Sequence, residues 1–121
     1  MAIKTEIIDG IGVITPEGEF TIEEAKDCLI DLFTTLPVKH TIWDLTQSDL
    51  SGFAATDFLE ISKTGDAFSD QRGPGARAAL VGKSVFDRML LKAFTAFANR
   101  TVERELGIFD TLDEAFAWLQ D

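Results

Sequence analysis

The chain has 121 residues, of which 45% are hydrophobic, so it suits one domain, residues 1–121, with one packed core. Its formal net charge of −10 argues against nucleic-acid binding, which needs basic patches that neutralise phosphates. No apolar run approaches the roughly 18 residues of a membrane span, and the N-terminal segment has no apolar signal core. We therefore expect a cytoplasmic protein without a nucleic-acid partner.

The first third of the chain predicts two strands and a helix. Residues 4–8 and 11–16 form strands around a tight Asp9-Gly10 turn, which is typical of an antiparallel hairpin. Thr21 and Glu24 then form a capping box, in which each side chain satisfies a free amide at the helix start. The apolar side chains that follow at helical spacing are Ile22, Ala25, Leu29, Leu32, Phe33 and Leu36.

The middle of the chain predicts a strand, a helix, a long loop and another strand. Residues 40–45 form a strand that ends in an acidic loop, and a helical pattern runs from about 53 to 64. The glycine-containing loop from 65 to 75 is expected to be mobile and to be cut first by proteases near Arg72. Residues 77–81 are apolar and lie between glycines, which is typical of a buried parallel strand.

The helix predicted over residues 84–98 is unusually apolar. The side chains expected to face inward are Phe86, Met89, Leu90, Ala93, Phe94 and Phe97. Leu91, Phe94 and Ala98 form an additional flank, wider than one sheet face should cover. This flank contacts a neighbouring helix, a second subunit in a homodimer, an apolar ligand or a lipid surface, and the sequence leaves these alternatives open.

The end of the chain predicts a strand over 102–109, more exposed than the others because charges alternate along it. Thr111 and Glu114 form a second capping box, which opens the last helix. The whole order is β-β-α-β-α-β-α-β-α. Such alternation predicts an α/β fold with a mixed, mainly parallel sheet covered by helices.

Polar residues follow the carboxyl ends of the predicted parallel strands, where open α/β sheets carry their binding sites. The candidate ligand or partner edge consists of Asp44, Thr46, Ser48, Asp49, Ser51, Lys83, Ser84 and Thr111. Three helix starts together with Lys83 would suit an anion. The alternative is that Ser51, Ser84 and Thr111 are ordinary helix caps and that Lys83 is solvated.

The sequence offers no catalytic constellation and no cofactor motif. Gly82-Lys83-Ser84 resembles the end of a phosphate-binding loop, but Arg77 stands where that motif needs glycine. His40, the single histidine, begins a strand far from the candidate edge, so no nucleophile–histidine system can be assembled there. Cys28, the single cysteine, lies in a helical apolar stripe and is expected to be an inert buried thiol, without disulfide or zinc. We therefore predict a protein that is not an enzyme and uses no metal or other cofactor.

Three segments carry a resemblance that extends over nearly the whole chain: TIWDLTQSDLSGF, RAALVG and GIFDTLDEAFAWL. Together with the hairpin start, they resemble the STAS fold of anti-sigma-factor antagonists, and more narrowly the bacterial SpoIIAA-like proteins grouped with STAS and Sec14 (CRAL-TRIO) domains. In the antagonists the corresponding loop reads Asp-Ser-Ser-Gly, and its first serine accepts phosphate. Here that position holds Leu50, and the neighbouring Ser51 is expected to cap the next helix.

The resemblance implies a non-catalytic regulatory or interaction module that binds a protein partner, without the phosphorylation switch of the antagonists. The Sec14 side of the resemblance implies an alternative, a small protein that binds an apolar ligand or a lipid surface. What the apolar flank of the 84–98 helix contacts would distinguish the two.

Overall fold

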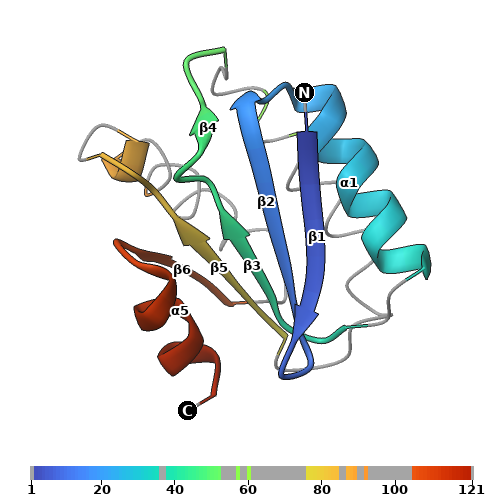
Figure 1. The fold of residues 1–121 in the computed structure, drawn as a ribbon, viewed down its shortest axis with the longest axis vertical. Coiled ribbons are helices and arrows are strands. Elements are labelled where there is room, and N and C mark those ends of the chain that lie inside the picture. The colour runs from blue at the N-terminus through green and yellow to red at the C-terminus, as the bar shows by residue number, and fades with distance from the viewer. Residues whose placement is uncertain are drawn as a thin grey trace.

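The computed structural model describes residues 2–35, 38–52, 57, 60, 76–84, 87–89, 92 and 105–120. Within these ranges the strands are β1 (Ala2–Ile8), β2 (Ile11–Glu19), β3 (Thr41–Asp44), β4 (Ser48–Asp49), β5 (Arg77–Val81) and β6 (Glu105–Phe109). The helices with described bounds are α1 (Ile22–Thr35) and α5 (Leu112–Leu119). Figure 1 shows the strands side by side, with α1 and α5 at opposite sides of the sheet.

The strands form one mixed sheet in the order β1-β2-β3-β5-β6, and β4 pairs with the far end of β2. β1 is antiparallel to β2, whereas β2, β3, β5 and β6 pair in parallel along the sheet. The predicted α/β class and the mainly parallel sheet are confirmed. β6 is an edge strand, in agreement with the exposed position expected from its charges.

The hairpin that opens the fold closes at the predicted turn. Ile8 lies opposite Ile11, so Asp9 and Gly10 alone connect the strands. Both have positive φ, 53° for Asp9 and 79° for Gly10. Positive φ at both central residues defines a type I′ turn, whose twist matches that of two antiparallel strands.

Alternating side chains of the sheet bury two separate apolar clusters. On one face Ile14, Trp43 and Leu80 pack with Ala25 and Leu29 of α1. On the other face the cluster comprises Ile11, Val13, Ile42, Ala79, Val81, Ala115 and Leu119, the last two from α5. The strands therefore have apolar side chains on both faces, as buried parallel strands do.

The helix starts follow the capping rules. Thr21 Oγ1 accepts from the Glu24 amide at 3.2 Å, and Glu24 Oε1 accepts from the Thr21 amide at 3.3 Å, so the predicted capping box is present.

Residues 57 and 60, inside the predicted second helix, are helical. Lys26 of α1 forms an ion pair with Glu60 at 3.5 Å.

Two details differ from the sequence analysis. β4 was not predicted, because Ser48-Asp49 is too short to show a pattern of its own and pairs only with the far end of β2. Met89 was expected to face inward but is 65% exposed, whereas Asp87 is buried. The apolar stripe predicted for this helix is therefore wrong at Met89. The loop over 65–75 and the flank residues Leu91, Phe94 and Ala98 lie outside the described residues.

Candidate functional site

The carboxyl ends of β3, β5 and β6 lie side by side at one edge of the sheet. The ladder continues past the strand ends, because the Leu45 amide donates to the Val81 carbonyl at 2.9 Å and the Gly82 amide donates to the Phe109 carbonyl at 3.3 Å. Two turns leave from this edge. We call residues 44–51 the first turn and residues 82–88, of which 85 and 86 lie outside the described residues, the second turn.

The first turn begins with a closed local network. Asp44 Oδ1 accepts from the Thr46 amide at 3.2 Å and from Thr46 Oγ1 at 2.6 Å. Such a carboxylate–backbone turn satisfies the polar groups as the chain leaves the strand. Both Asp44 and Thr46 therefore have a structural role at this edge.

Ser48 fastens the first turn to β2. Its Oγ donates to the Pro16 carbonyl at 2.9 Å, and the side chain is completely buried. The backbone pairs as well, because Gly18 donates to the Gln47 carbonyl at 2.9 Å and Phe20 donates to the Asp49 carbonyl at 3.3 Å. A kinase cannot reach the Ser48 hydroxyl in this structure, since the oxygen is bonded and has no access to solvent.

The extended backbone of β4 decides which side chains of the first turn face the core. Successive side chains of an extended chain point to opposite sides, and here Ser48 and Leu50 are buried whereas Asp49 and Ser51 are exposed. Leu50 is 4% exposed and belongs to the cluster that contains Phe20 and Trp43. The position that the family resemblance assigns to the phosphate acceptor therefore carries a core residue.

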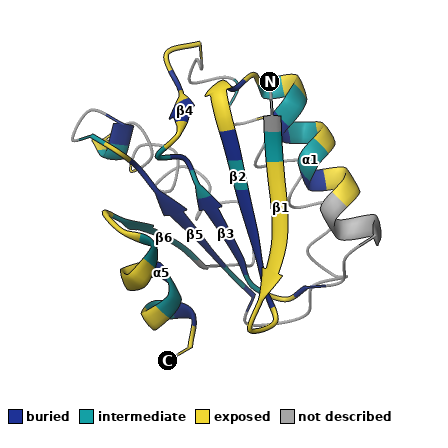
Figure 2. Cartoon of the chain, viewed as in Figure 1, coloured by how far each residue is buried: buried dark blue, intermediate teal, exposed yellow. Residues whose placement is uncertain are grey.

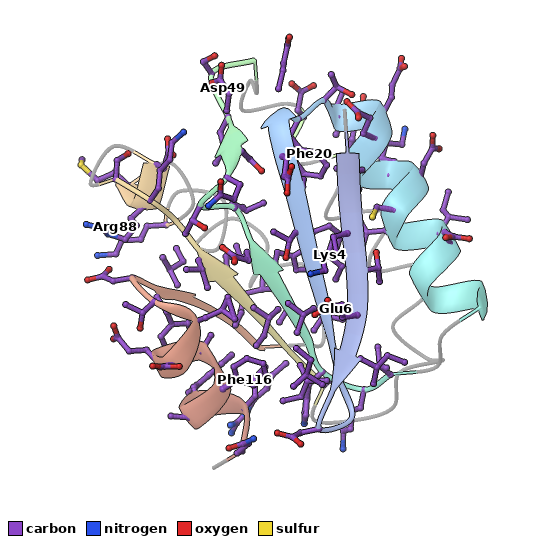
Figure 3. All side chains as sticks on the ribbon, viewed as in Figure 1. Lys4, Glu6, Phe20, Asp49, Arg88 and Phe116 are labelled. Atoms are coloured by element: carbon purple, nitrogen blue, oxygen red, sulfur yellow. The ribbon has the colours of Figure 1, made fainter. Side chains whose placement is uncertain are left out.

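Asp49 is the exposed acid of the first turn (Figure 3). Its Oδ1 accepts from the Ser51 amide at 3.0 Å. Backbone and side-chain hydrogen bonds from Ser51 lower the pKa of Asp49, and the charge of Lys83 in the second turn lowers it further. The residues that Ser51 would cap, 53–56, lie outside the described residues, so its capping role stays a prediction.

The second turn places a cation against the end of β6. The Arg88 Nε lies 2.9 Å from Asp110 Oδ1, and its Nη1 donates to the Gly82 carbonyl at 3.2 Å. This pair was not predicted from the sequence. The sequence contains a signal for it. Asp110 directly follows β6, and Arg88 lies one helical turn after Ser84, which follows the neighbouring strand β5.

Asp87 has an unusual environment in the second turn. Its amide donates to Ser84 Oγ at 3.1 Å, so Ser84 caps this helix as one of the two readings predicted. Its carboxylate is 7% exposed, and Oδ2 is fully buried without a hydrogen-bond partner among the described residues. A buried carboxylate oxygen without a donor is costly, so this position is a weak point of the edge.

The remaining candidate residues have ordinary roles. Thr111 Oγ1 accepts from the Glu114 amide at 3.2 Å and caps α5. His40 lies at the opposite edge, where its Nδ1 accepts from the Arg77 amide at 3.1 Å. Cys28 is half-buried, and burial, with smaller contributions from Asp31 and Asp27, raises the pKa of its thiol to about 11. The thiol is therefore protonated at neutral pH and a poor nucleophile.

The edge as a whole offers charged contact groups rather than reactive ones. The side chains of six of its predicted residues are hydrogen-bonded inside the protein: Asp44, Thr46, Ser48, Asp49, Ser84 and Thr111. The exposed residues include Asp49, Ser51, Lys83, Asp110 and Thr111. Within the described ranges, no three His, Cys, Asp or Glu side chains gather as metal ligands, and no helix is long and apolar enough to cross a membrane.

Comparisons with known proteins identify the fold. No protein-family model matches the chain, and no curated protein does. Among solved structures, an anti-sigma factor antagonist from Mycobacterium paratuberculosis is 16% identical, with a TM-score of 0.69 over 99% of this chain and 94% of that one. The anti-sigma factor antagonist SpoIIAA in its unphosphorylated form is 15% identical, with a TM-score of 0.61 over 98% of both chains.

A third similar structure is an uncharacterised protein from Shewanella loihica, described as having a SpoIIAA-like fold. It is 20% identical, with a TM-score of 0.58 over 98% of this chain and 92% of that one. The chain therefore has a SpoIIAA-like fold, which confirms the resemblance given by its sequence. At these identities the likeness defines the fold alone.

Proposed function

We propose that the protein is a non-catalytic regulatory module that binds a protein partner through the exposed part of its candidate edge, Asp49, Ser51 and Lys83. The proposal depends on one observation: some side chains of this edge are bonded inside the fold, and others are exposed. The hydroxyls of Thr46, Ser48 and Ser84 and the carboxylate of Asp44 are bonded inside the fold, while charges of both signs remain exposed. Exposed charges suit electrostatic recognition of another protein.

SpoIIAA, one of the proteins with a similar structure, has a phosphorylated form, whereas this module works without a phosphorylation switch. Support comes from Leu50 and Ser48, whose side chains are both buried. Ser51 is the exposed hydroxyl of this turn. Phosphopeptide mapping from cells should find Ser48 and Ser51 unmodified, and substantial phosphate on either one would restore the switch.

The partner contact can be tested with a photo-reactive amino acid at Lys83 and, as a matched control, at Lys39. Lys39 is also an exposed lysine, but it precedes β3 and so lies at the opposite edge of the sheet. Cross-links to one protein from position 83 and not from position 39, weakened by Asp49→Lys, are expected. Equal cross-linking from both positions would contradict the proposal. A cytoplasmic location is part of this proposal.

A second candidate is binding of an apolar ligand or a lipid surface by the helix predicted over 84–98, through Leu91, Phe94 and Ala98. The observation that favours it is Met89, which is a large apolar side chain of the same segment and is strongly exposed. The homodimer predicted from the same flank stays a prediction. Native mass spectrometry and vesicle flotation of wild type and Met89→Glu test both uses, and a ligand-free monomer that ignores vesicles would contradict both.

A further inference from the structure

β1 is an edge strand with an open side. It pairs with β2 along its whole length, and no described strand lies on its other side (Figure 1). Figure 2 shows it exposed along most of its length. Residues 4–8 are all exposed, including the large apolar side chains Ile7 at 52% and Ile8 at 38%. A long, exposed and partly apolar edge strand is a ready template for another strand.

The hairpin register determines which backbone groups point outward. The pair that closes a two-residue hairpin exchanges two hydrogen bonds, and bonded pairs then alternate with non-bonded pairs. Because Ile8 and Ile11 close this hairpin, the even residues of β1 bond to β2. The amides and carbonyls of Ile3, Thr5 and Ile7 therefore point away from β2, toward the side on which no described strand lies.

The charges on β1 select a register for a second copy of the same strand. Lys4 and Glu6 form an ion pair at 2.8 Å within the strand and are well exposed (Figure 3). In an antiparallel pair centred on Thr5, Lys4 lies opposite Glu6 of the second copy, and Ile3 lies opposite Ile7. Shifting the centre to residue 4 or 6 places Lys4 opposite Lys4, or Glu6 opposite Glu6, which opposes pairing.

We infer that β1 is a self-association edge, on which two copies of the chain pair antiparallel about a two-fold axis at Thr5. The register centred on Thr5 uses all three outward residues in about six backbone hydrogen bonds. It also forms two opposite-charge pairs and covers Ile7 with Ile3. Lysine on an edge strand usually discourages pairing, but here each lysine meets a glutamate, so the charges specify the register instead. A two-fold pair of identical edges closes on itself and does not grow into a fibre.

Charge reversal tests the register directly. Lys4→Glu places like charges opposite each other at both symmetric positions, so the dimer Kd should rise about tenfold or more. The exchange Lys4→Glu with Glu6→Lys restores both cross-strand pairs and the pair within each strand, so it should return the Kd to near the wild-type value. Sedimentation equilibrium measures both variants, and circular dichroism confirms that they are folded.

Hydrogen exchange supplies a control within the same strand. The amides of Thr5 and Ile7 should gain protection as protein concentration rises, whereas those of Lys4 and Glu6, already bonded to β2, should not change. Thr5→Pro removes an outward donor and leaves the β1–β2 ladder intact, so it should also abolish the dimer.

Two results would overturn this inference. One is a wild-type protein that stays monomeric up to about 1 mM, the weak limit of useful affinity. The other is a dimer that survives Lys4→Glu and Thr5→Pro but is lost in Leu91→Glu, which would assign self-association to the helix predicted over 84–98.

Discussion

The two turns at the candidate edge differ in how completely their buried polar atoms are satisfied. In the first turn the buried hydroxyl of Ser48 has a backbone acceptor, and the Asp44 carboxylate accepts two bonds. In the second turn Asp87 is also buried, but one of its carboxylate oxygens has no donor within the described part of the chain. In the first turn Ser48 and Asp44 are therefore hydrogen-bonded, whereas in the second turn Asp87 Oδ2 lacks a donor.

This difference bears on the role that the family resemblance assigns to the first turn. Where the acceptor serine is expected from the family resemblance, the first turn here buries Leu50 against Phe20 and Trp43. A residue at such a position cannot be changed freely, since closely packed interiors respond to the loss of even one methylene group. At this position the first turn therefore carries a packing residue.

The largest expected effect is that of Leu50→Ser, which restores the serine of the antagonist pattern. It should lower the free energy of unfolding by about 3–5 kcal/mol, because it removes a buried side chain and buries a hydroxyl in its place. Leu50→Met, which conserves volume, should cost less than about 1.5 kcal/mol. Urea unfolding of both variants measures the difference, and a serine variant as stable as wild type would show that Leu50 is no core residue.

Ser48→Ala should have the next largest effect. The change removes the donor to the Pro16 carbonyl in a site closed to water, and an unmet buried acceptor costs about 1–3 kcal/mol. The exposed neighbouring variant Gln47→Ala should stay within about 0.5 kcal/mol of wild type. Thermal unfolding of the pair decides the matter. Equal melting temperatures would mean that the Ser48 bond does not hold β4 to β2.

Asp87→Asn neutralises the buried carboxylate of the second turn. Unlike the two changes in the first turn, it should increase stability. Asp87 lies near the N-terminus of its helix, where the helix dipole favours a negative charge by about 0.3–1 kcal/mol. Burying one carboxylate oxygen without a donor costs more, so the neutral amide should raise the free energy of unfolding by about 1 kcal/mol. A clear loss of stability at neutral pH would show that Oδ2 has a partner in solution, either a bound cation or a hydrogen-bond donor of another protein. Added salts and candidate partners would then separate those two sources.

Much of this fold could be predicted because its signals are local. The Asp9-Gly10 turn and the caps at Thr21 and Thr111 each depend on a few adjacent residues, and all three are present. β4 could not be predicted, because two residues form a strand only when a longer neighbour, β2, extends beside them.

The candidate edge could be predicted from topology alone, but its burial could not. Strand order brings the carboxyl ends together whatever residues follow them. Whether Ser48 or Asp49 faces the core depends on the phase of β4, which is set by pairing with β2 rather than by local sequence. The predicted burial of Met89 was wrong for a related reason. A pattern that counts only apolar residues cannot predict that Asp87 is buried.

The smallest expected effect is on the pKa of Asp49, which depends on residues of both turns, Ser51 and Lys83. Hydrogen bonds from Ser51, and then the Lys83 charge, hold the pKa of Asp49 below its ordinary value of 3.8. A carboxyl whose pKa is lowered by folding stabilises the protein above its unfolded pKa. That contribution is therefore complete at neutral pH and is lost as the pH falls below 3.8 through the folded pKa.

Ser51→Ala should raise the pKa of Asp49 by removing the side-chain bond, and Lys83→Gln should raise it less, because the lysine acts through exposed solvent. Carbon-detected NMR titration of the Asp49 carboxyl measures both shifts. High salt should diminish the effect of Lys83→Gln and leave that of Ser51→Ala, since screening weakens a distant charge more than a direct hydrogen bond. If neither substitution moves the titration, the two turns do not share an electrostatic environment, and the exposed charges of the edge act independently.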